Sequence, residues 1–182
     1  QGLLVAIPYE AAVRLLVQNA AIGDPATFDK LDLNHFEEAL KVNGIAPMAL
    51  MQAFLPHLRR GKGRVLHLGT SVAHNPQKGT ATYGITKAAF HRLYQQLNAE
   101  DLGVPVASLS PGLVDTEGVR DHVAKARRVD LPHVKFFDTA FDKGLTTEMA
   151  ELMTFVEHVL QATDSEFMAK EWRFSEWRKQ VA

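Results

Sequence analysis

The sequence contains no cysteine in its 182 residues, and its charges nearly cancel. A chain without cysteine forms neither a disulfide framework nor a thiolate nucleophile, and this fits a cytoplasmic protein. The 20 Lys and Arg residues stand against 21 Asp and Glu residues, which leaves a formal net charge of −1. Such a balance provides no overall field to attract nucleic acid or anionic lipid. We therefore expect neither nucleic acid nor a membrane as a partner.

Long apolar runs and short metal-binding motifs are missing as well. No apolar stretch approaches the roughly 20 residues of a membrane-spanning helix, and the N-terminus lacks the basic start of a signal peptide. The eight histidines form neither a His-x-x-x-His nor a His-Glu-x-x-His arrangement, so the sequence predicts no metal site. With 46% apolar and 23% charged residues, residues 1–182 are typical of one globular domain.

Three short apolar runs predict strands, at residues 12–20, 63–71 and 104–112. Each is too short for a buried helix and is followed by small or turn-forming residues. Helical periodicity fills the intervals at 34–60 and 82–100, and Asn34 with Glu37 resembles a capping box at the start of the first helix. The alternation of strands and helices predicts an α/β fold with a parallel sheet.

The two ends of the chain have less regular patterns. Residues 113–145 predict a partly helical excursion, 146–163 a helix, 165–174 a last strand with alternating character, and the remaining tail a solvated segment. Residues 2–7 are apolar and have three interpretations: a remnant of a first strand, one half of a hairpin with 13–17, or a segment outside the sheet. The next five residues are too few for a parallel crossover.

Polar and small residues follow each predicted strand, at 18–21, 69–71 and 110–112. In open parallel sheets, ligands bind beyond the carboxyl ends of the strands. Tyr83 and Lys87 begin the helix after the second strand and lie one turn apart, which places an ammonium beside a phenol. Either these side chains cover a helix flank, or the cation lowers the pKa of the phenol for acid catalysis.

Asn43 occupies an apolar position of the predicted helix 34–60. A buried amide costs free energy unless it is hydrogen-bonded. Two interpretations therefore remain open: Asn43 has a functional partner, or Asn43 and Gly44 form a local helix cap or kink.

Taken in order, the segments QNAA, KVNG, GTS, YGITK and SPGLVDT resemble the short-chain dehydrogenase/reductase family. The resemblance is close over residues 13–116. It implies a Rossmann-like doubly wound parallel sheet, here truncated at its N-terminus. It also implies an NAD(P)-dependent enzyme that interconverts a small-molecule carbonyl and a secondary alcohol, with NAD or NADP as the cofactor.

The same resemblance assigns roles to individual residues. Tyr83 would be the general acid, Lys87 would lower the pKa of Tyr83 and hold the nicotinamide ribose, and Asn43 would position a water. Ser71 would polarise the carbonyl and complete the catalytic group. The implied cofactor contacts come from Asn19, Ala20, Tyr83, Lys87, Pro111, Gly112 and Thr116.

Three features depart from the family pattern. The family usually has Asn-Asn-Ala-Gly where residues 18–21 read Gln-Asn-Ala-Ala. Its carbonyl-binding serine usually precedes the tyrosine by thirteen positions, a place held here by Thr70, whereas Ser71 precedes Tyr83 by twelve. We favour Ser71 over Thr70. Thirdly, no glycine-rich phosphate turn follows a strand, because the GKG segment at 61–63 precedes one.

The missing turn leaves two views of the chain. Either it is a truncated form of an ordinary enzyme, or it is a shortened, catalytically inactive remnant that serves as a binding or oligomerisation module. Helices 34–60 and 82–100 resemble those with which family members pair, which implies a homodimer or homotetramer. Residues 113–145 correspond to the family's substrate-loop region. There, Phe136, Phe137 and Phe141 either line the substrate pocket or pack against the protein's own core.

Overall fold

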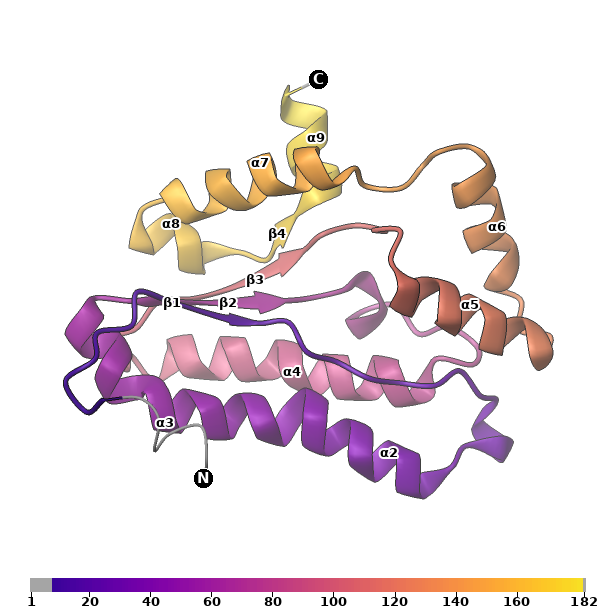
Figure 1. Cartoon of the computed structure of the whole chain (residues 1–182), viewed down its shortest axis with the longest axis horizontal. Coiled ribbons are helices and arrows are strands. Elements are labelled where there is room, and N and C mark those ends of the chain that lie inside the picture. Colours follow the sequence, from indigo (N-terminus) through magenta and orange to yellow (C-terminus); the bar gives the residue numbers. More distant parts are fainter. Residues whose placement is uncertain (1–7, 182) are drawn as a thin grey trace.

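A computed structural model describes residues 8–181, so the prediction for residues 2–7 lies outside the described part. Four strands form one sheet in the order β1-β2-β3-β4, and every neighbouring pair is parallel (Figure 1). The strands are β1 (Leu15–Gln18), β2 (Arg64–Leu68), β3 (Val106–Ser110) and β4 (Trp172–Arg173). The predicted α/β fold with a parallel sheet is confirmed, and the three predicted N-terminal strands are present.

Helices cover both faces of the sheet (Figure 1). On one face lie α2 (Leu33–Leu40), α3 (Ala46–Gly61) and α4 (Ala81–Ala99), and on the other lie α7 (Met149–Gln161), α8 (Asp164–Ala169) and α9 (Phe174–Val181). Beyond the carboxyl ends of the strands lie α5 (Glu117–Arg128) and α6 (Val134–Asp142). Within residues 8–181, no helix combines the length and apolar character needed to cross a bilayer.

Alternating strand residues supply two apolar cores, one on each face of the sheet. Val65 and Val106 pack with residues of α3 and α4. Leu66 and Leu109 point the other way and pack with Phe155 of α7 and residues of the C-terminal segment. Because both faces are buried, the central strands carry apolar residues on both faces, with His67 and Ser108 as buried polar exceptions, which explains why they read as short apolar runs.

The helix predicted over 34–60 is interrupted by a π-helical turn at Lys41–Ile45. It begins one residue earlier than predicted, because the side chain of Asp32 caps it by accepting a hydrogen bond from the Asn34 backbone N–H at 2.9 Å. The predicted capping box at Asn34 is therefore wrong. Asn43 lies inside the π turn, and the chain continues into α3, so it is not a helix C-cap.

The last strand predicted over 165–174 is mostly wrong, since only Trp172–Arg173 pair with β3. The segment before it forms α8, because Thr163 and Glu166 form a capping box. Glu166 N donates to Thr163 Oγ1 at 3.3 Å, and Thr163 N donates to Glu166 Oε2 at 2.9 Å. The tail forms α9, where Trp177 packs on Phe155 with ring centroids 5.3 Å apart, so it is not merely a solvated segment.

The excursion at 113–145 folds as α5, α6 and their connections, and it has a small core of its own. Phe137 and Phe141 pack against this core, whereas the Phe136 side chain remains 62% exposed. For Phe137 and Phe141, the structure supports packing against the protein's own core.

Candidate active site at the strand ends

Tyr83 and Lys87 lie in the first turns of α4, as the sequence predicts. The Lys87 Nζ donates to the backbone carbonyl of Leu68, the last residue of β2, at 2.5 Å. It lies 6.0 Å from the centre of the Tyr83 ring and 4.4 Å from that of Phe90. Lys87 is only 4% exposed, and this burial lowers its pKa to about 8. An ammonium is thus fixed at a strand end beside a phenol.

The pKa of Tyr83 differs from the sequence-based expectation. Burial raises the pKa of the phenol, whereas the sequence predicts that Lys87 lowers it. The physical reason is that the phenol is largely removed from water, while the Lys87 ammonium is engaged by the Leu68 carbonyl. Near neutral pH, Tyr83 therefore keeps its proton and is available as a proton donor.

Asn43 connects the loop after β1 with α4. Its Oδ1 accepts from the Ile22 N–H at 2.8 Å, and its Nδ2 donates to the Ile22 carbonyl at 2.7 Å and to Thr86 Oγ1 at 2.8 Å. These bonds use both amide hydrogens, so only a lone pair of Oδ1 remains for a water. The bonds observed make Asn43 a positioning residue, and its predicted contact with a water stays a prediction.

The loop that Asn43 holds also contacts the candidate acid. A Cβ on Gly23 would lie 2.9 Å from the Tyr83 Cβ, so the loop backbone packs directly on the tyrosine. Gly23 is not among the site residues predicted from the sequence. The available indication was its place among small residues, five positions after the buried strand residue Gln18.

The geometry distinguishes the two candidate hydroxyls after β2. Thr70 Oγ1 accepts from the Val72 N–H at 3.4 Å and caps the short 3-10 turn η3 (Ser71–Ala73). Ser71 begins that turn at an exposed position, and no hydrogen bond of its hydroxyl is found among residues 8–181. Ser71 is therefore the freer of the two for a ligand.

The residues predicted to contact a cofactor also follow the strand ends: Asn19 and Ala20 after β1, and Pro111, Gly112 and Thr116 after β3. Gly112 has φ +77°, and a Cβ there would lie 2.5 Å from Thr147 Oγ1, so this turn requires glycine. The Thr116 hydroxyl caps α5 by accepting from the Val119 N–H at 3.3 Å. Asn19 and Ala20 are exposed.

The GKG segment is a tight connection between α3 and β2. Lys62 is the C-cap of α3 with φ 47°, and a Cβ on Gly63 would lie 2.2 Å from the Val13 carbonyl oxygen. This segment therefore precedes β2 and faces Val13, as expected for a surface connection. In the described part of the chain, no glycine-rich turn follows a strand.

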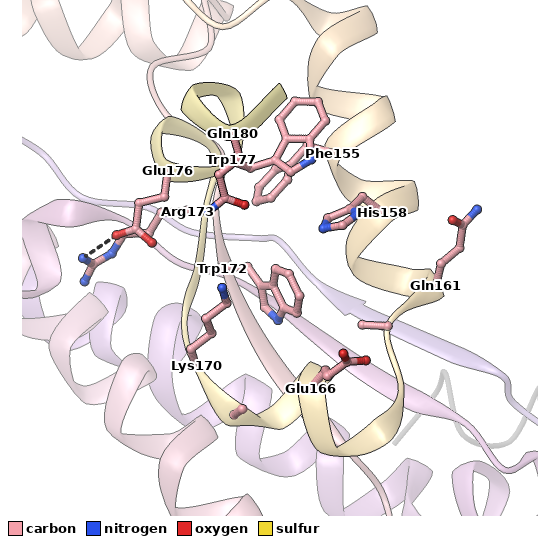
Figure 2. Close-up of a pocket in the computed structure, with 12 residues that line it drawn as sticks. Phe155, His158, Gln161, Glu166, Lys170, Trp172, Arg173, Glu176, Trp177 and Gln180 are labelled. Atoms are coloured by element: carbon pink, nitrogen blue, oxygen red, sulfur yellow. Dashed lines mark hydrogen bonds and ion pairs between the residues drawn. The ribbon is translucent and has the colours of Figure 1, made fainter. Parts of the chain in front are cut away.

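Two hollows lie outside this group of residues. One, of about 680 Å³, is bounded by residues 27–29, by residues 72–74 and 76–81 ahead of and at the start of α4, and by Gly84, Ile85 and Ala88 of α4. The other, of about 370 Å³, lies among the C-terminal elements, where Trp172 and Trp177 face it with His158 and Lys170 (Figure 2). Tyr83 lines neither hollow.

A parallel sheet covered on both faces by helices, with polar side chains gathered at its carboxyl ends, defines the Rossmann-like class of α/β proteins. Within that class the family can be stated. The sequence profile of the short chain dehydrogenase family matches residues 7–127, and the chain belongs to this family.

Individual relatives agree with this assignment. The chain is 30% identical over 154 residues to the short chain dehydrogenase asqE of Emericella nidulans, covering 72% of this chain and 57% of that protein. The crystal structure of the KRED1-Pglu enzyme covers 88% of this chain and 68% of its own, with a TM-score of 0.80 at 22% identity, which shows the fold.

A third comparison is with a cofactor complex. An alcohol dehydrogenase from the archaeon Thermococcus sibiricus, complexed with 5-hydroxy-NADP, is 30% identical and covers 58% of this chain and 45% of its own, with a TM-score of 0.55. The chain spans about half the length of the curated relatives it matches.

Proposed function

We propose that this chain carries the catalytic part of an NAD(P)-dependent oxidoreductase that interconverts a carbonyl and a secondary alcohol. The observation that carries the proposal is the buried pair of Tyr83 and Lys87 at the carboxyl end of β2. The cofactor in the Thermococcus sibiricus alcohol dehydrogenase complex supports a nicotinamide dinucleotide.

The chain's own residues fit the nicotinamide end of such a cofactor. A lysine ammonium has three N–H donors, and Lys87 uses one of them on the Leu68 carbonyl. Two donors therefore remain for the hydroxyls of a ribose, and the residues Asn19, Ala20 and Gly112 that follow β1 and β3 are exposed to a ligand. A bound nicotinamide would supply the hydride.

Tyr83 provides the proton in this proposal. The phenol is protonated near neutral pH and can donate to a carbonyl oxygen that gains negative charge, while burial raises its pKa and makes it a weaker acid than a free phenol. The hydroxyl of Ser71, which begins the 3-10 turn η3 ahead of α4, would donate a hydrogen bond to the same oxygen. Asn43 holds the loop at Ile22 and Gly23 against Tyr83 and so fixes the position of the acid.

The test is turnover and cofactor binding by the Tyr83→Phe variant. Removing a general acid typically costs about 10²- to 10⁴-fold in rate, so we expect carbonyl reduction to fall by about 10³-fold. Binding of NADH and NADPH, followed by tryptophan fluorescence, should change little. Tyr94→Phe is the matched control, because Tyr94 is a buried tyrosine further along α4. Equal turnover by Tyr83→Phe and the unmodified protein would refute the assignment.

The alternative is a non-catalytic binding or oligomerisation module of the same family. The observation that favours it is that Tyr83 borders neither of the two hollows. This alternative predicts that neither the tryptophan fluorescence nor the melting temperature responds to either nucleotide. Both forms of the proposal share further expectations. The chain forms a single domain, assembles as a homodimer or homotetramer and lies in the cytoplasm. Residues 113–145 cover the substrate region.

A further inference from the structure

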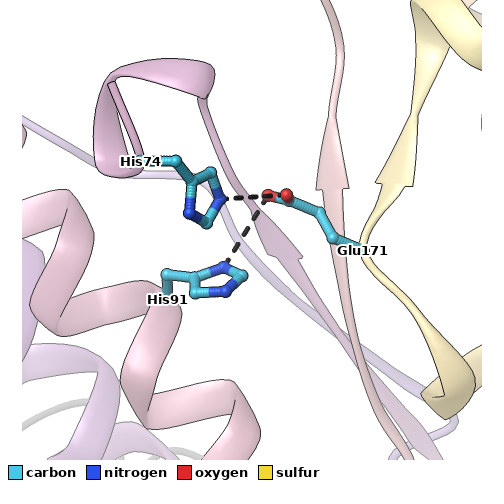
Figure 3. A group of neighbouring side chains, drawn as sticks. All are labelled: His74, His91 and Glu171. Atoms are coloured by element: carbon cyan, nitrogen blue, oxygen red, sulfur yellow. Dashed lines mark hydrogen bonds and ion pairs between the residues drawn. The ribbon is translucent and has the colours of Figure 1, made fainter. Parts of the chain in front are cut away.

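Three side chains from distant parts of the chain meet beside β4 (Figure 3). His74 follows η3, His91 lies on α4, and Glu171 immediately precedes β4. One ligand atom from each side chain lies within 4.8 Å of the others. His74 Nε2 is 3.0 Å from Glu171 Oε2, and His91 Nδ1 is 3.7 Å from Glu171 Oε1.

The cluster is largely shielded from solvent. The exposed fraction of the side chain is 7% for Glu171, 15% for His91 and 30% for His74. His91 Nδ1 is buried without a hydrogen-bond partner in the described part of the chain. A Cβ on Gly69, just after β2, would lie 2.9 Å from Glu171 Oε1 and 2.7 Å from Ser108 Oγ, so the carboxylate packs directly against the backbone of this glycine. The unpartnered nitrogen points at the space between the three groups (Figure 3).

We propose that His74, His91 and Glu171 form a binding site for Zn²⁺ or a similar divalent transition metal ion. Zinc binds imidazole nitrogen and carboxylate oxygen at about 2.0–2.2 Å, so ligand atoms in a tetrahedral site lie about 3.3–3.5 Å apart. The two separations, 3.0 Å from His74 Nε2 to Glu171 Oε2 and 3.7 Å from His91 Nδ1 to Glu171 Oε1, are close to this value, and each histidine faces a different oxygen of the carboxylate. The partly exposed side, next to His74, leaves the fourth position to a water.

Neighbouring polar groups can orient two of these ligands. The Gln95 side-chain Nε2 lies 3.2 Å from His91 Nε2. If the amide is flipped, so that its oxygen faces the ring, it accepts the Nε2 hydrogen and leaves the Nδ1 lone pair for the metal. Ser108 Oγ donates to Glu171 Oε1 at 3.4 Å and so helps to hold the carboxylate.

Arg173 is the group that opposes a cation here. Its guanidinium donates to Glu171 Oε2 at 3.1 and 3.2 Å, and it also pairs with Glu176 at 3.3 Å. A carboxylate has about four lone-pair directions, so Glu171 can hold the guanidinium and a metal together. The positive charge nevertheless weakens cation binding, and Arg173→Met should bind zinc more tightly than the unmodified protein.

Metal binding at this site would connect three segments that lie far apart in the sequence. A bound ion would join η3, α4 and the start of β4, and any ligand that binds the folded state alone raises the melting temperature. The prediction of no metal site rested on motifs within single segments. Positions 74, 91 and 171 are too far apart in the sequence for any such motif to include them.

The experiment measures Zn²⁺ binding to the whole chain by competition with a chromophoric chelator, and Co²⁺ binding by visible absorption. We expect one ion per chain. Loss of an outer hydrogen-bond partner typically costs 10- to 100-fold in metal affinity, so His74→Ala and His91→Ala should each lose at least about 100-fold. The Co²⁺ spectrum should show the strong d–d bands of a four-coordinate site.

His133→Ala is the matched control, because His122 and His133 form another pair with Nε2 atoms 3.2 Å apart. This variant should keep full affinity. The inference fails if zinc does not bind, or if His74→Ala binds it as well as the unmodified protein does. In that case the cluster is only a hydrogen-bonded ion pair. His74 is the decisive position, since a surface alanine leaves the core intact. The readout is metal affinity and does not depend on Tyr83 or on catalysis.

Discussion

The two parts of the molecule bury different kinds of side chain. Among the described residues, those before 113 bury many polar or charged groups: Gln18, Asn43, His57, His67, Thr80, Thr82, Thr86, Lys87 and Ser108. From residue 113 on, the buried set is apolar with the exception of Thr147. Burying polar groups costs free energy unless each is hydrogen-bonded. The first part therefore depends on hydrogen bonds for most of its buried polar groups, whereas the second part is stabilised mainly by apolar packing.

His67 illustrates the cost in the first part. Its ring stacks on Phe90 with centroids 4.3 Å apart, and neither ring nitrogen has a hydrogen-bond partner within residues 8–181. Burial lowers the pKa of His67 to about 3, so the ring is neutral at physiological pH. An apolar side chain would fill the same place without two unsatisfied nitrogens.

The largest expected effect is in the apolar second part. Phe155 is fully buried and touches Phe174 and Trp177, with ring centroids 5.8 and 5.3 Å away. Phe155→Ala should lower the free energy of unfolding by about 4 kcal/mol, because it removes buried area and leaves a cavity. Urea unfolding measures this. A loss below about 1 kcal/mol would mean that the second part does not carry the stability of the fold.

The next effect concerns Asn43 in the polar first part. Asn43→Ala leaves the Ile22 backbone and the Thr86 hydroxyl without their partner, and we expect a loss of about 3 kcal/mol in the free energy of unfolding. Turnover should fall as well, because Ile22–Gly23 would no longer be held against Tyr83.

Asn98 offers a matched control for this substitution. Its side chain also makes two bonds to one backbone residue, donating to the Val106 carbonyl at 2.7 Å and accepting from the Val106 N–H at 3.1 Å. Asn98→Ala should therefore cost stability in urea while leaving turnover unchanged. If both variants lose turnover equally, Asn43 acts only through general stability.

The smallest expected change in the free energy of unfolding has the opposite sign, because the substitution stabilises the protein. Lys87→Met should raise the free energy of unfolding by about 2 kcal/mol at pH 7, since an apolar side chain replaces a buried charge. It should also abolish turnover. The folded-state pKa of Lys87, about 8, lies below the ordinary value of 10.5. Between these values the unfolded state binds more protons, so the stability of the unmodified protein rises with pH.

The difference in stability between Lys87→Met and the unmodified protein should accordingly become smaller as the pH rises from 8 to above 10. Thermal melting of both proteins across that pH range measures this difference. Lys143→Met, at an exposed position, serves as the comparison and should show no such pH dependence. A constant advantage at all pH values would contradict a deprotonating Lys87.

How far the sequence predicts this structure depends on the distance between interacting residues. Tyr83 and Lys87 lie one turn apart on one helix, so periodicity alone places them together. Residues 165–174 alternate like a strand, but the capping box at Thr163 starts a helix there, and local hydrogen bonds prevail over the pattern. His74, His91 and Glu171 meet only through the tertiary fold.

Because of the π turn at Lys41–Ile45, the geometry of the candidate active site depends on the number of residues in this turn. A π turn holds one extra residue within a single helical turn, so deleting one residue here would restore a regular α-helix without rotating α2 against α3, while the residues of the turn itself would change position. The Asn43 amide would then turn away from Ile22. Single-residue deletions and insertions are therefore a class of inactivating change at this position that a scan of substitutions would never sample.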